Sequence, residues 1–514
     1  MYSRQTVRNA LFSVAQVLVN GLATFVLYRF ALGRVGPVLF GVWTLVTAIA
    51  SITRLSDAGL AGGVVKFVAQ YAARGDQGAV REVVTTSVTS ISVLSAAILA
   101  AGYFPLHWYL ARVVSGAELH VAAGLLPWVL GGLWLNIVAG IFLAALDGYQ
   151  RIDLRCTVLM GAAAALLVAS LAAVPVWGVK GLVIAQAVQG GFTLAGSFLV
   201  LRRVAVHLPA VPVRWNAARF REMLGYGTSF QVMSVAAIGY DVTTKSLLSR
   251  FGGLPAVGYF EMANRLVSLL RGLIISASQV LVPVVADLRE RDPGAVLSVY
   301  RRSLRALTFI TLPPMALAAV LAPAISALWL GHVEAGFVQA MVLLLAGTTA
   351  NILGTPAYYV NLGTGQLRWN TAGHLLIGVL NVVLGYLLGA WLGPTGAVVG
   401  WVASLVAGSA LITVAYHLEH GISLRELAAR VDAGLWATFL TGFGVAVVGV
   451  VGVRGAPVAP VTAWVAAGTS AATLLLAVWL HPLRRGLVSA VCGAVPPLRR
   501  LADLVSARRV GASR

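Results

Sequence analysis

Long runs of apolar residues recur along nearly the whole chain, and they constrain its fold more than any other feature of the sequence. Each run is about 20 residues long, which is the length of helix that crosses the hydrocarbon core of a bilayer. Charged residues make up 11% of the 514 residues, against roughly 25% in a soluble globular domain. A soluble core could not hide so much apolar surface. The sequence therefore predicts an all-α, polytopic membrane protein.

Fourteen apolar segments are long enough to span the membrane, and the loops between them are short. The longest loop on the outer side is expected from His107 to Val121, and no soluble domain is expected between the helices. The predicted spans are 7–29, 38–60, 83–106, 122–146, 156–177, 180–201, 224–249, 256–282, 304–330, 336–362, 371–392, 395–417, 434–453 and 460–480.

The distribution of arginine and lysine predicts the orientation of these helices. With the N-terminus inside, 27 of the 37 basic residues fall in inner segments, 6 fall in outer segments and 4 lie within helices. Cytoplasmic loops of membrane proteins carry such an excess of positive charge. We therefore expect a multi-pass protein of the cytoplasmic (inner) membrane with both termini in the cytoplasm.

The same excess explains the formal net charge of +20 better than nucleic-acid binding does. The basic segment 482–514 is expected either to lie on anionic lipid as an amphipathic tail or to be frayed. The two cysteines, Cys156 and Cys492, have no metal-ligand spacing. Neither a metal nor another cofactor is expected. The first apolar stretch is too long for a cleavable signal peptide.

A shift of 217 residues aligns two halves of the chain. It pairs Gly36 with Gly253 where two predicted spans begin, and Arg54 with Arg271 within those spans. Both halves start inside and have six helices, so the repeat is parallel, with its axis along the membrane normal. The predicted parts are two six-helix bundles, two further helices and a tail, over residues 1–203, 204–420, 421–481 and 482–514.

Short motifs at the ends of several spans carry a family resemblance. They are the stretches Leu55–Leu60, Arg34–Gly41, Leu254–Tyr259 and Leu146–Arg151. These motifs resemble those of the polysaccharide transporters in the multidrug/oligosaccharidyl-lipid/polysaccharide superfamily. The resemblance implies two six-helix bundles around a central cavity. It also implies a flippase, not an enzyme, for an undecaprenyl-diphosphate-linked oligosaccharide of an O-antigen, capsule or exopolysaccharide.

The resemblance also implies partners. They are the lipid-linked oligosaccharide, membrane lipids, and the polymerase and chain-length proteins of polysaccharide assembly. Coupling to protons and coupling to sodium ions both remain open.

Ionisable residues within membrane helices are costly and usually face a polar cavity. Arg54 and Arg271 lie at matching depths, and an arginine offers a fork of donors that suits phosphate oxygens. These two residues are therefore candidates for substrate contact, although Arg54 could instead pair with Asp57. Further candidates for the cavity are Lys245, Arg265 and Asn264.

Two acids in the second half lie four residues from a base. Asp241 precedes Lys245 and Glu261 precedes Arg265, and both spacings allow an intrahelical ion pair. Each pair either neutralises itself or lends one member to the substrate or to a coupling ion. Asp241, Asp57 and Glu261 are the candidates for ion coupling.

Three other functions remain as alternatives. An ion-coupled multidrug exporter would share twelve core helices, and a flippase for the peptidoglycan lipid precursor would share fourteen. A membrane glycosyltransferase or ligase needs acids near its outer loops, where this chain has Glu118 and Glu334. His374 is expected to be an interfacial residue, and Pro313–Pro314 is a candidate hinge.

Overall fold

The computed structural model describes residues 4–51, 60–205, 207–209, 214–278, 281–423 and 433–455, with short pieces between 468 and 479. These residues form helices and short connections, as the sequence predicts. The helices are α1 (Arg4–Ser51), α2 (Leu60–Ala73), α3 (Gln77–Val113), α4 (Ala117–Gly148), α5 (Ile152–Trp177), α6 (Val179–Val204), α7 (Ala217–Ser278), α8 (Leu281–Arg291), α9 (Pro293–Val320), α10 (Ala322–Leu330), α11 (Ala335–Thr364), α12 (Arg368–Leu392), α13 (Pro394–Glu419) and α14 (Ala433–Gly455).

Every predicted span up to 434–453 overlaps one of these helices. Within the described residues, nine helices are long and apolar enough to cross a membrane. The last predicted span, 460–480, falls largely outside the described part of the chain, as does the tail 482–514, so the total of fourteen spans stays a prediction.

The two longest helices, α1 and α7, are each divided by a glycine. Helix α1 has 48 residues and would measure about 72 Å if straight, more than twice the thickness of the hydrocarbon core. It turns at Gly36 (φ 78°, ψ 168°), and α7 turns at Gly253 (φ 71°, ψ 178°). This conformation is open to glycine and strained for other residues. The two turns lie 217 residues apart, at the spacing of the sequence repeat.

Two boundaries differ from the sequence prediction. The loop expected from His107 to Val121 is wrong, because α3 continues to Val113 and α4 begins at Ala117. Histidine, tryptophan and tyrosine at 107–109 are common in helices that reach the membrane surface. The end of the strongly apolar run therefore did not mark the end of the helix. The span 304–330 is interrupted at Leu321. Pro323 has no N–H to donate to the carbonyl four residues earlier, which explains the break.

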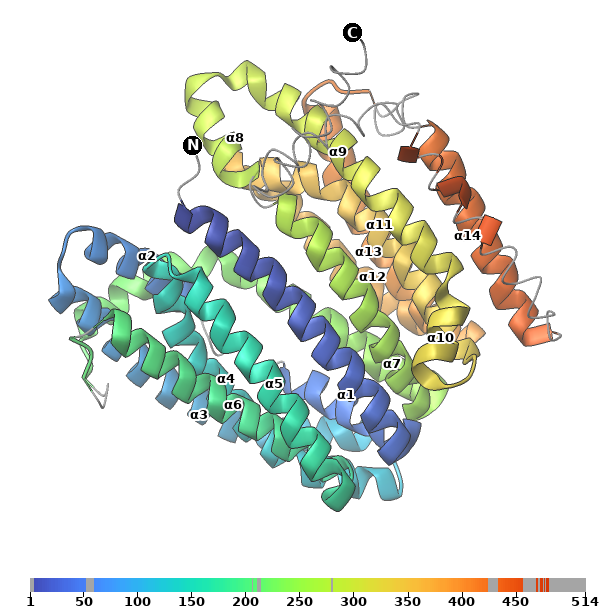
Figure 1. The fold of residues 1–514 in the computed structure, drawn as a ribbon, viewed down its shortest axis with the longest axis horizontal. Helices are drawn as coiled ribbons and strands as arrows, with labels where there is room; N and C mark the ends of the chain where they lie inside the picture. The colour runs from blue at the N-terminus through green and yellow to red at the C-terminus, as the bar shows by residue number, and fades with distance from the viewer. Residues whose placement is uncertain are drawn as a thin grey trace, which may run out of the picture. The chain divides into compact units, whose positions relative to one another are not determined.

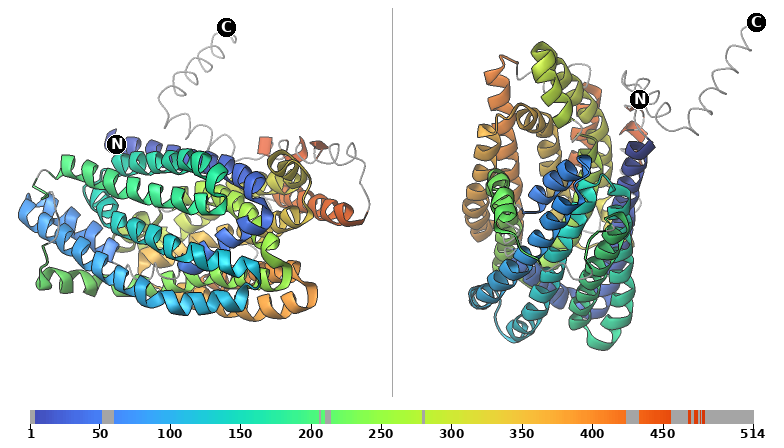
Figure 2. Two further views of the ribbon diagram at one scale, coloured as in Figure 1. Left: turned by 90° about the horizontal axis from the view of Figure 1, so that it is seen from below. Right: turned by 90° about the vertical axis from the view of Figure 1, so that its left-hand side faces the viewer.

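The described chain forms two compact units. The first comprises Met1–Leu273, Ala324–Thr348 and Leu367–Leu411, and the second comprises Ile274–Pro323, Thr349–Gln366 and Ile412–Arg514. In the first unit, α4 packs on α6 and α3, and α5 packs on α6 and α1 (Figures 1 and 2). Small residues allow these close approaches. A Cβ at Gly190 of α6, for example, would lie 3.0 Å from Leu135 of α4.

In the second unit, α9 packs against α14. Its core contains Tyr300, whose hydroxyl lies 2.6 Å from Nε2 of the fully buried His417. Tyr416 packs against Tyr300 with 4.6 Å between ring centroids. Aromatic and aliphatic side chains thus surround one polar contact inside this unit.

Large aromatic side chains of the first unit are exposed at the helix ends predicted to face outside. Phe104 and Trp108 lie near the end of α3, Trp177 ends α5, and Trp391 lies near the end of α12. Trp391 is 79% exposed. Tryptophan and other aromatic residues gather at membrane–water interfaces, so these positions fit the outer surface of the bilayer.

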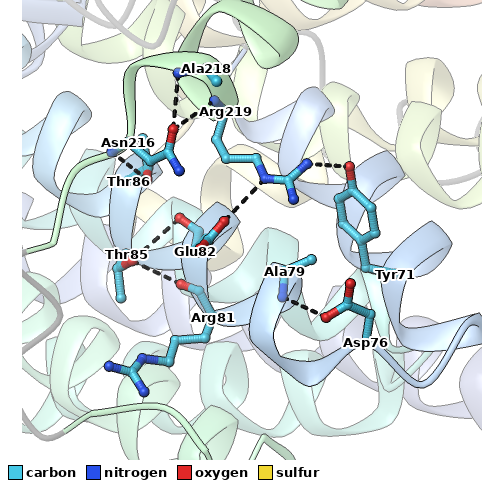
Figure 3. A network of polar contacts seen from close by, with 10 residues as sticks. All are labelled: Tyr71, Asp76, Ala79, Arg81, Glu82, Thr85, Thr86, Asn216, Ala218 and Arg219. Carbon is cyan, nitrogen blue, oxygen red and sulfur yellow. Dashed lines mark hydrogen bonds and ion pairs between the residues drawn. The ribbon is translucent and has the colours of Figure 1, made fainter.

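The connection between the two halves is attached to the first half (Figure 3). Arg219, in the first turn of α7, donates to the Tyr71 hydroxyl over 2.6 Å, and its Nε lies 3.3 Å from Oε2 of Glu82. The Asn216 side chain accepts from the backbone N–H of Ala218 over 3.0 Å, which caps the start of α7. The entry of the second half therefore has a fixed position against α2 and α3.

Candidate functional site

Six of the eight candidate site residues lie on α7, on either side of the turn at Gly253. Arg54 and Asp57 fall outside the described residues, so their roles remain predictions. The six are Asp241 and Lys245 before the turn, and Glu261, Asn264, Arg265 and Arg271 after it. All of them belong to the first compact unit.

Lys245 joins the two segments of α7. Its Nζ lies 2.9 Å from Oδ2 of Asp241 and 2.8 Å from Oε2 of Glu261. The side chain of Lys245 is 6% exposed and that of Glu261 is 12% exposed, whereas that of Asp241 is 39% exposed. The predicted pair of Asp241 with Lys245 is present. Lys245 also neutralises Glu261, a contact between helix segments that spacing along one helix does not predict.

Glu261 is bound from a second side by Tyr28 of α1. The Tyr28 hydroxyl donates to Oε1 of Glu261 over 3.0 Å. Phe40 and Trp43 pack around the Tyr28 ring, at centroid distances of 5.1 and 6.0 Å. The carboxylate thus receives one neutral and one charged donor, one on each oxygen.

Arg265 and Asn264 lie on the turn of helix after Glu261. Arg265 is exposed, and its charge acts on the Glu261 carboxylate. Asn264 is half-buried. The sequence predicted Arg265 as the partner that neutralises Glu261. In the structure Lys245 and Tyr28 bind the Glu261 carboxylate directly, and Arg265 acts on it as a further charge.

Arg271 lies six residues after Arg265 on α7 and has different neighbours. Its side chain is exposed, and its charge acts on the imidazole of His374 in α12. The Tyr240 hydroxyl lies 3.2 Å from Nδ1 of His374 and 2.6 Å from the His374 carbonyl oxygen. Asn381 donates to the Tyr240 carbonyl oxygen over 3.2 Å. The phenol and the imidazole are thus in direct contact, and the Arg271 guanidinium lies close enough for its charge to act on the imidazole.

The two groups suit different chemistry. Around Lys245 two acids surround a buried base, so the charges largely cancel within the protein. Around Arg271 the exposed guanidinium carries several N–H donors in a planar fork, which suits an anion with several oxygens. Within the part of the chain that the structure describes, no group of three or more His, Cys, Asp or Glu side chains is placed to hold a metal ion.

A third polar cluster lies where α1 meets the start of α5. Asp153 is buried and forms ion pairs with Arg8 and with Arg151, the latter at 3.1 Å. The Asn9 side chain accepts from the backbone N–H of Asp153 over 3.2 Å. Short polar contacts of this kind fix helix ends, and we assign this cluster to structure.

Tyr28, Tyr240 and His374 were missed or underrated by the sequence interpretation. Tyr28 occupies the position 217 residues before Lys245, so the repeat itself was a signal that the two face a shared partner. His374 was expected only to be interfacial. Tyr240 carried no signal, because a tyrosine in a membrane helix is usually a packing residue.

The sequence of this chain from residue 35 to residue 333 matches the family of polysaccharide biosynthesis proteins. That segment is more than half of the chain. No curated protein is similar enough in sequence to match it.

Several solved transporters share the fold. An inward-facing multidrug resistance MATE family transporter of the MOP superfamily is 16% identical, with a TM-score of 0.65 over 82% of this chain and 98% of its own. The lipid II flippase MurJ, in an inward closed conformation, is 13% identical, with a TM-score of 0.66 over 90% and 98%. A MOP superfamily transporter from Pyrococcus furiosus is 16% identical, with a TM-score of 0.53 over 81% and 94%.

Proposed function

The chain belongs to the polysaccharide biosynthesis protein family, and we propose that it flips an undecaprenyl-diphosphate-linked oligosaccharide across the cytoplasmic membrane by alternating access. The fold of this membrane protein is that of MOP superfamily transporters. Family and fold indicate a transporter. The lipid-linked oligosaccharide as substrate, the cytoplasmic membrane as location and movement from inside to outside are our proposal.

The exposed guanidinium of Arg271 carries the proposal. A charged side chain in a membrane-spanning segment is costly unless it faces water or a ligand. Arg271 is exposed and its charge acts on His374, and its guanidinium offers donors to more than one oxygen of a ligand. A diphosphate bears two charged groups with several oxygens, and it is the part common to all lipid-linked oligosaccharides of this kind. We therefore assign the diphosphate, and not the variable sugar, to Arg271.

The charge balance of the other site supports this assignment. Lys245 is occupied by Asp241 and Glu261, so we give it no direct substrate contact in this conformation. A drug exporter for cationic compounds would need an accessible acid that is not already neutralised. The partly exposed Asp241 is paired with Lys245 at 2.9 Å, whereas Arg271 is an exposed base. The family and its structural neighbours are linked to transport and polysaccharide assembly, and an enzyme is not proposed.

A transport assay with purified protein tests the proposal. The protein is reconstituted in vesicles that contain a lipid-linked oligosaccharide, and arrival of the sugar on the far leaflet is measured by a membrane-impermeant glycosidase. Arg271→Ala should lose most of the transport, because the diphosphate loses its charged partner. Arg271→Lys should recover part of it, because charge returns without the bidentate fork.

Arg250→Ala is the matched control. Arg250 lies near the end of the first segment of α7 and stacks on Tyr386 with 5.3 Å to the ring centroid. Its loss should leave transport close to that of the parent. Normal transport by Arg271→Ala would remove this residue from the substrate site. Absence of transport in the parent, together with efflux of cationic drugs, would favour the multidrug exporter.

A further inference from the structure

Two glycines bring the repeats into reciprocal contact just after the turns inside α1 and α7, on the side that is predicted to face outside. A Cβ at Gly41 would overlap the carbonyl oxygen of Leu254, and a Cβ at Gly258 would lie 3.3 Å from the carbonyl oxygen of Pro37. Gly41 corresponds to Gly258, and Pro37 corresponds to Leu254, at the 217-residue spacing. Each repeat therefore contacts the other with the same backbone positions, as two halves do around a pseudo-twofold axis.

Glu261 lies near this crossing and is bound by both repeats. Tyr28 and Lys245 are equivalent positions of the two halves, and each donates to one oxygen of the same carboxylate. Thr44, the counterpart of Glu261, has no charge and donates to a carbonyl of its own helix over 3.0 Å. One acid thus connects the first half to the second.

The burial of these groups makes the connection costly to break. The side chains of Lys245 and Glu261 are nearly inaccessible to solvent. Moving Glu261 away from Lys245 would break a buried ion pair, which is costly. The other charged groups that act on Glu261 or Lys245 are Arg265 and Asp241. Asp241 is partly exposed and can retain Lys245 when Glu261 departs, so the network has an alternative arrangement.

From this arrangement we propose that Glu261 is a latch that keeps the outer end of the transport path closed. Tyr28 and Lys245 hold it from the two repeats, and the glycine crossing supplies the close backbone contact. Opening to the outside then requires that Glu261 release at least one of these donors, with Asp241 retaining Lys245. The latch rests on the proposed function, because it acts in a cycle that exposes the path to each side in turn.

Labelling of a cysteine from outside tests the latch in the full-length protein. The reporter is Thr24→Cys, one helical turn before Tyr28 on α1, in a background with Cys156→Ser and Cys492→Ser. A membrane-impermeant thiol reagent is added to the outside of oriented vesicles. Glu261→Gln should raise the labelling rate by on the order of tenfold, which corresponds to about 1.4 kcal/mol in the opening equilibrium. Tyr28→Phe, which removes one hydrogen bond, should give a smaller increase.

Two further variants separate the latch from a general loss of structure. Glu334→Gln removes an acid that pairs with His332 at 3.4 Å in an outer connection, and it should leave labelling unchanged. Lys245→Arg keeps a cation between Asp241 and Glu261, and it should hold labelling close to the parent rate.

The outcomes show separately whether the latch proposal or the substrate proposal fails. Unchanged labelling in Glu261→Gln and in Tyr28→Phe, with both proteins folded in the membrane, would overturn the latch. If sugar transport occurs in the parent while labelling stays unchanged in both variants, the latch fails and the proposed function stands. If labelling rises as expected but no lipid-linked sugar is moved, the latch stands and the substrate assignment fails.

Discussion

Lys245 and Arg271 are both cations of α7, but their surroundings give them different tasks. Lys245 is enclosed by two carboxylates, so its charge serves contacts inside the protein. Arg271 is exposed near His374, so its charge can act on a ligand. A positive side chain in a membrane helix is therefore not by itself evidence of substrate binding, and its partners decide.

At this scale we predict that Lys245→Met destabilises the protein by about 3 kcal/mol or more, because it leaves the buried Glu261 without its cation. Unfolding in detergent would be followed by the fluorescence of a thiol-reactive dye. Adding Glu261→Gln to Lys245→Met should restore part of the stability, since the unpaired charge is then gone. Strict additivity of the two changes would argue against a direct pair.

Single elements were predicted well where hydrophobic length decides and poorly where local geometry does. The apolar runs gave the spans of α4, α5, α6 and α12, because a membrane helix needs uninterrupted apolar residues. The extension of α3 to Val113 was missed, because residues near the membrane surface are helical without being uniformly apolar. The contact of Tyr28 with Glu261 was missed because a hydropathy pattern does not show which helices pack against each other.

For the turn in α1 we predict opposite effects of two neighbouring substitutions. Gly36→Ala should destabilise the protein by roughly 1–3 kcal/mol, because its backbone conformation is reserved for glycine. Gly33→Ala should be neutral or stabilising by up to about 1 kcal/mol, because Gly33 lies in regular helix. A Cβ meets no neighbouring atom within 4 Å at either position, so conformation alone separates them. Melting temperatures of the two variants provide the comparison, and equal effects would contradict this account.

The connection before α7 gives a second prediction at this scale. Arg219→Ala should speed hydrogen exchange of backbone amides at residues 214–219, because the contacts with Tyr71 and Glu82 are lost. Arg221→Ala, an exposed arginine on the same helix, serves as the control and should leave exchange unchanged. Mass spectrometry of peptides from this region gives the rates. Similar exchange in both variants would mean that the connection is held by Asn216 and by Trp215, whose indole N–H donates to the Ser90 hydroxyl over 2.9 Å, without help from Arg219.

At the scale of the whole molecule, the recurring apolar spans were the most informative feature of the sequence. The family match and the shared fold confirm a multi-pass transporter body, while the orientation remains a prediction from basic residues. The residues proposed to bind the substrate could be predicted only in part. Arg271 stood out as a charge in a helix, but its position beside His374 depends on how α7 packs on α12, which no local pattern encodes.

Orientation can be measured directly with two exposed positions. Ser115→Cys, in the connection after α3, should react with an impermeant thiol reagent in intact cells. Ala73→Cys, at the end of α2, should react only after permeabilisation. Both side chains are exposed, so access from one side decides the result. The reverse pattern would invert the predicted topology and move the proposed latch to the cytoplasmic side.

The asymmetry of the acid at the crossing has a consequence for descent. An ancestor assembled from two identical half-length chains would place the same residue at positions 44 and 261, giving either two carboxylates or none. Two carboxylates near the axis would repel each other. Identical halves would also carry one and the same residue at positions 28 and 245, so a tyrosine and a lysine could not meet at a single acid. Fusion of the halves into one gene allows threonine at one position and glutamate at the other. The single acid therefore requires two halves that differ in sequence, and a second copy of the first half, with threonine at this position, could not supply it.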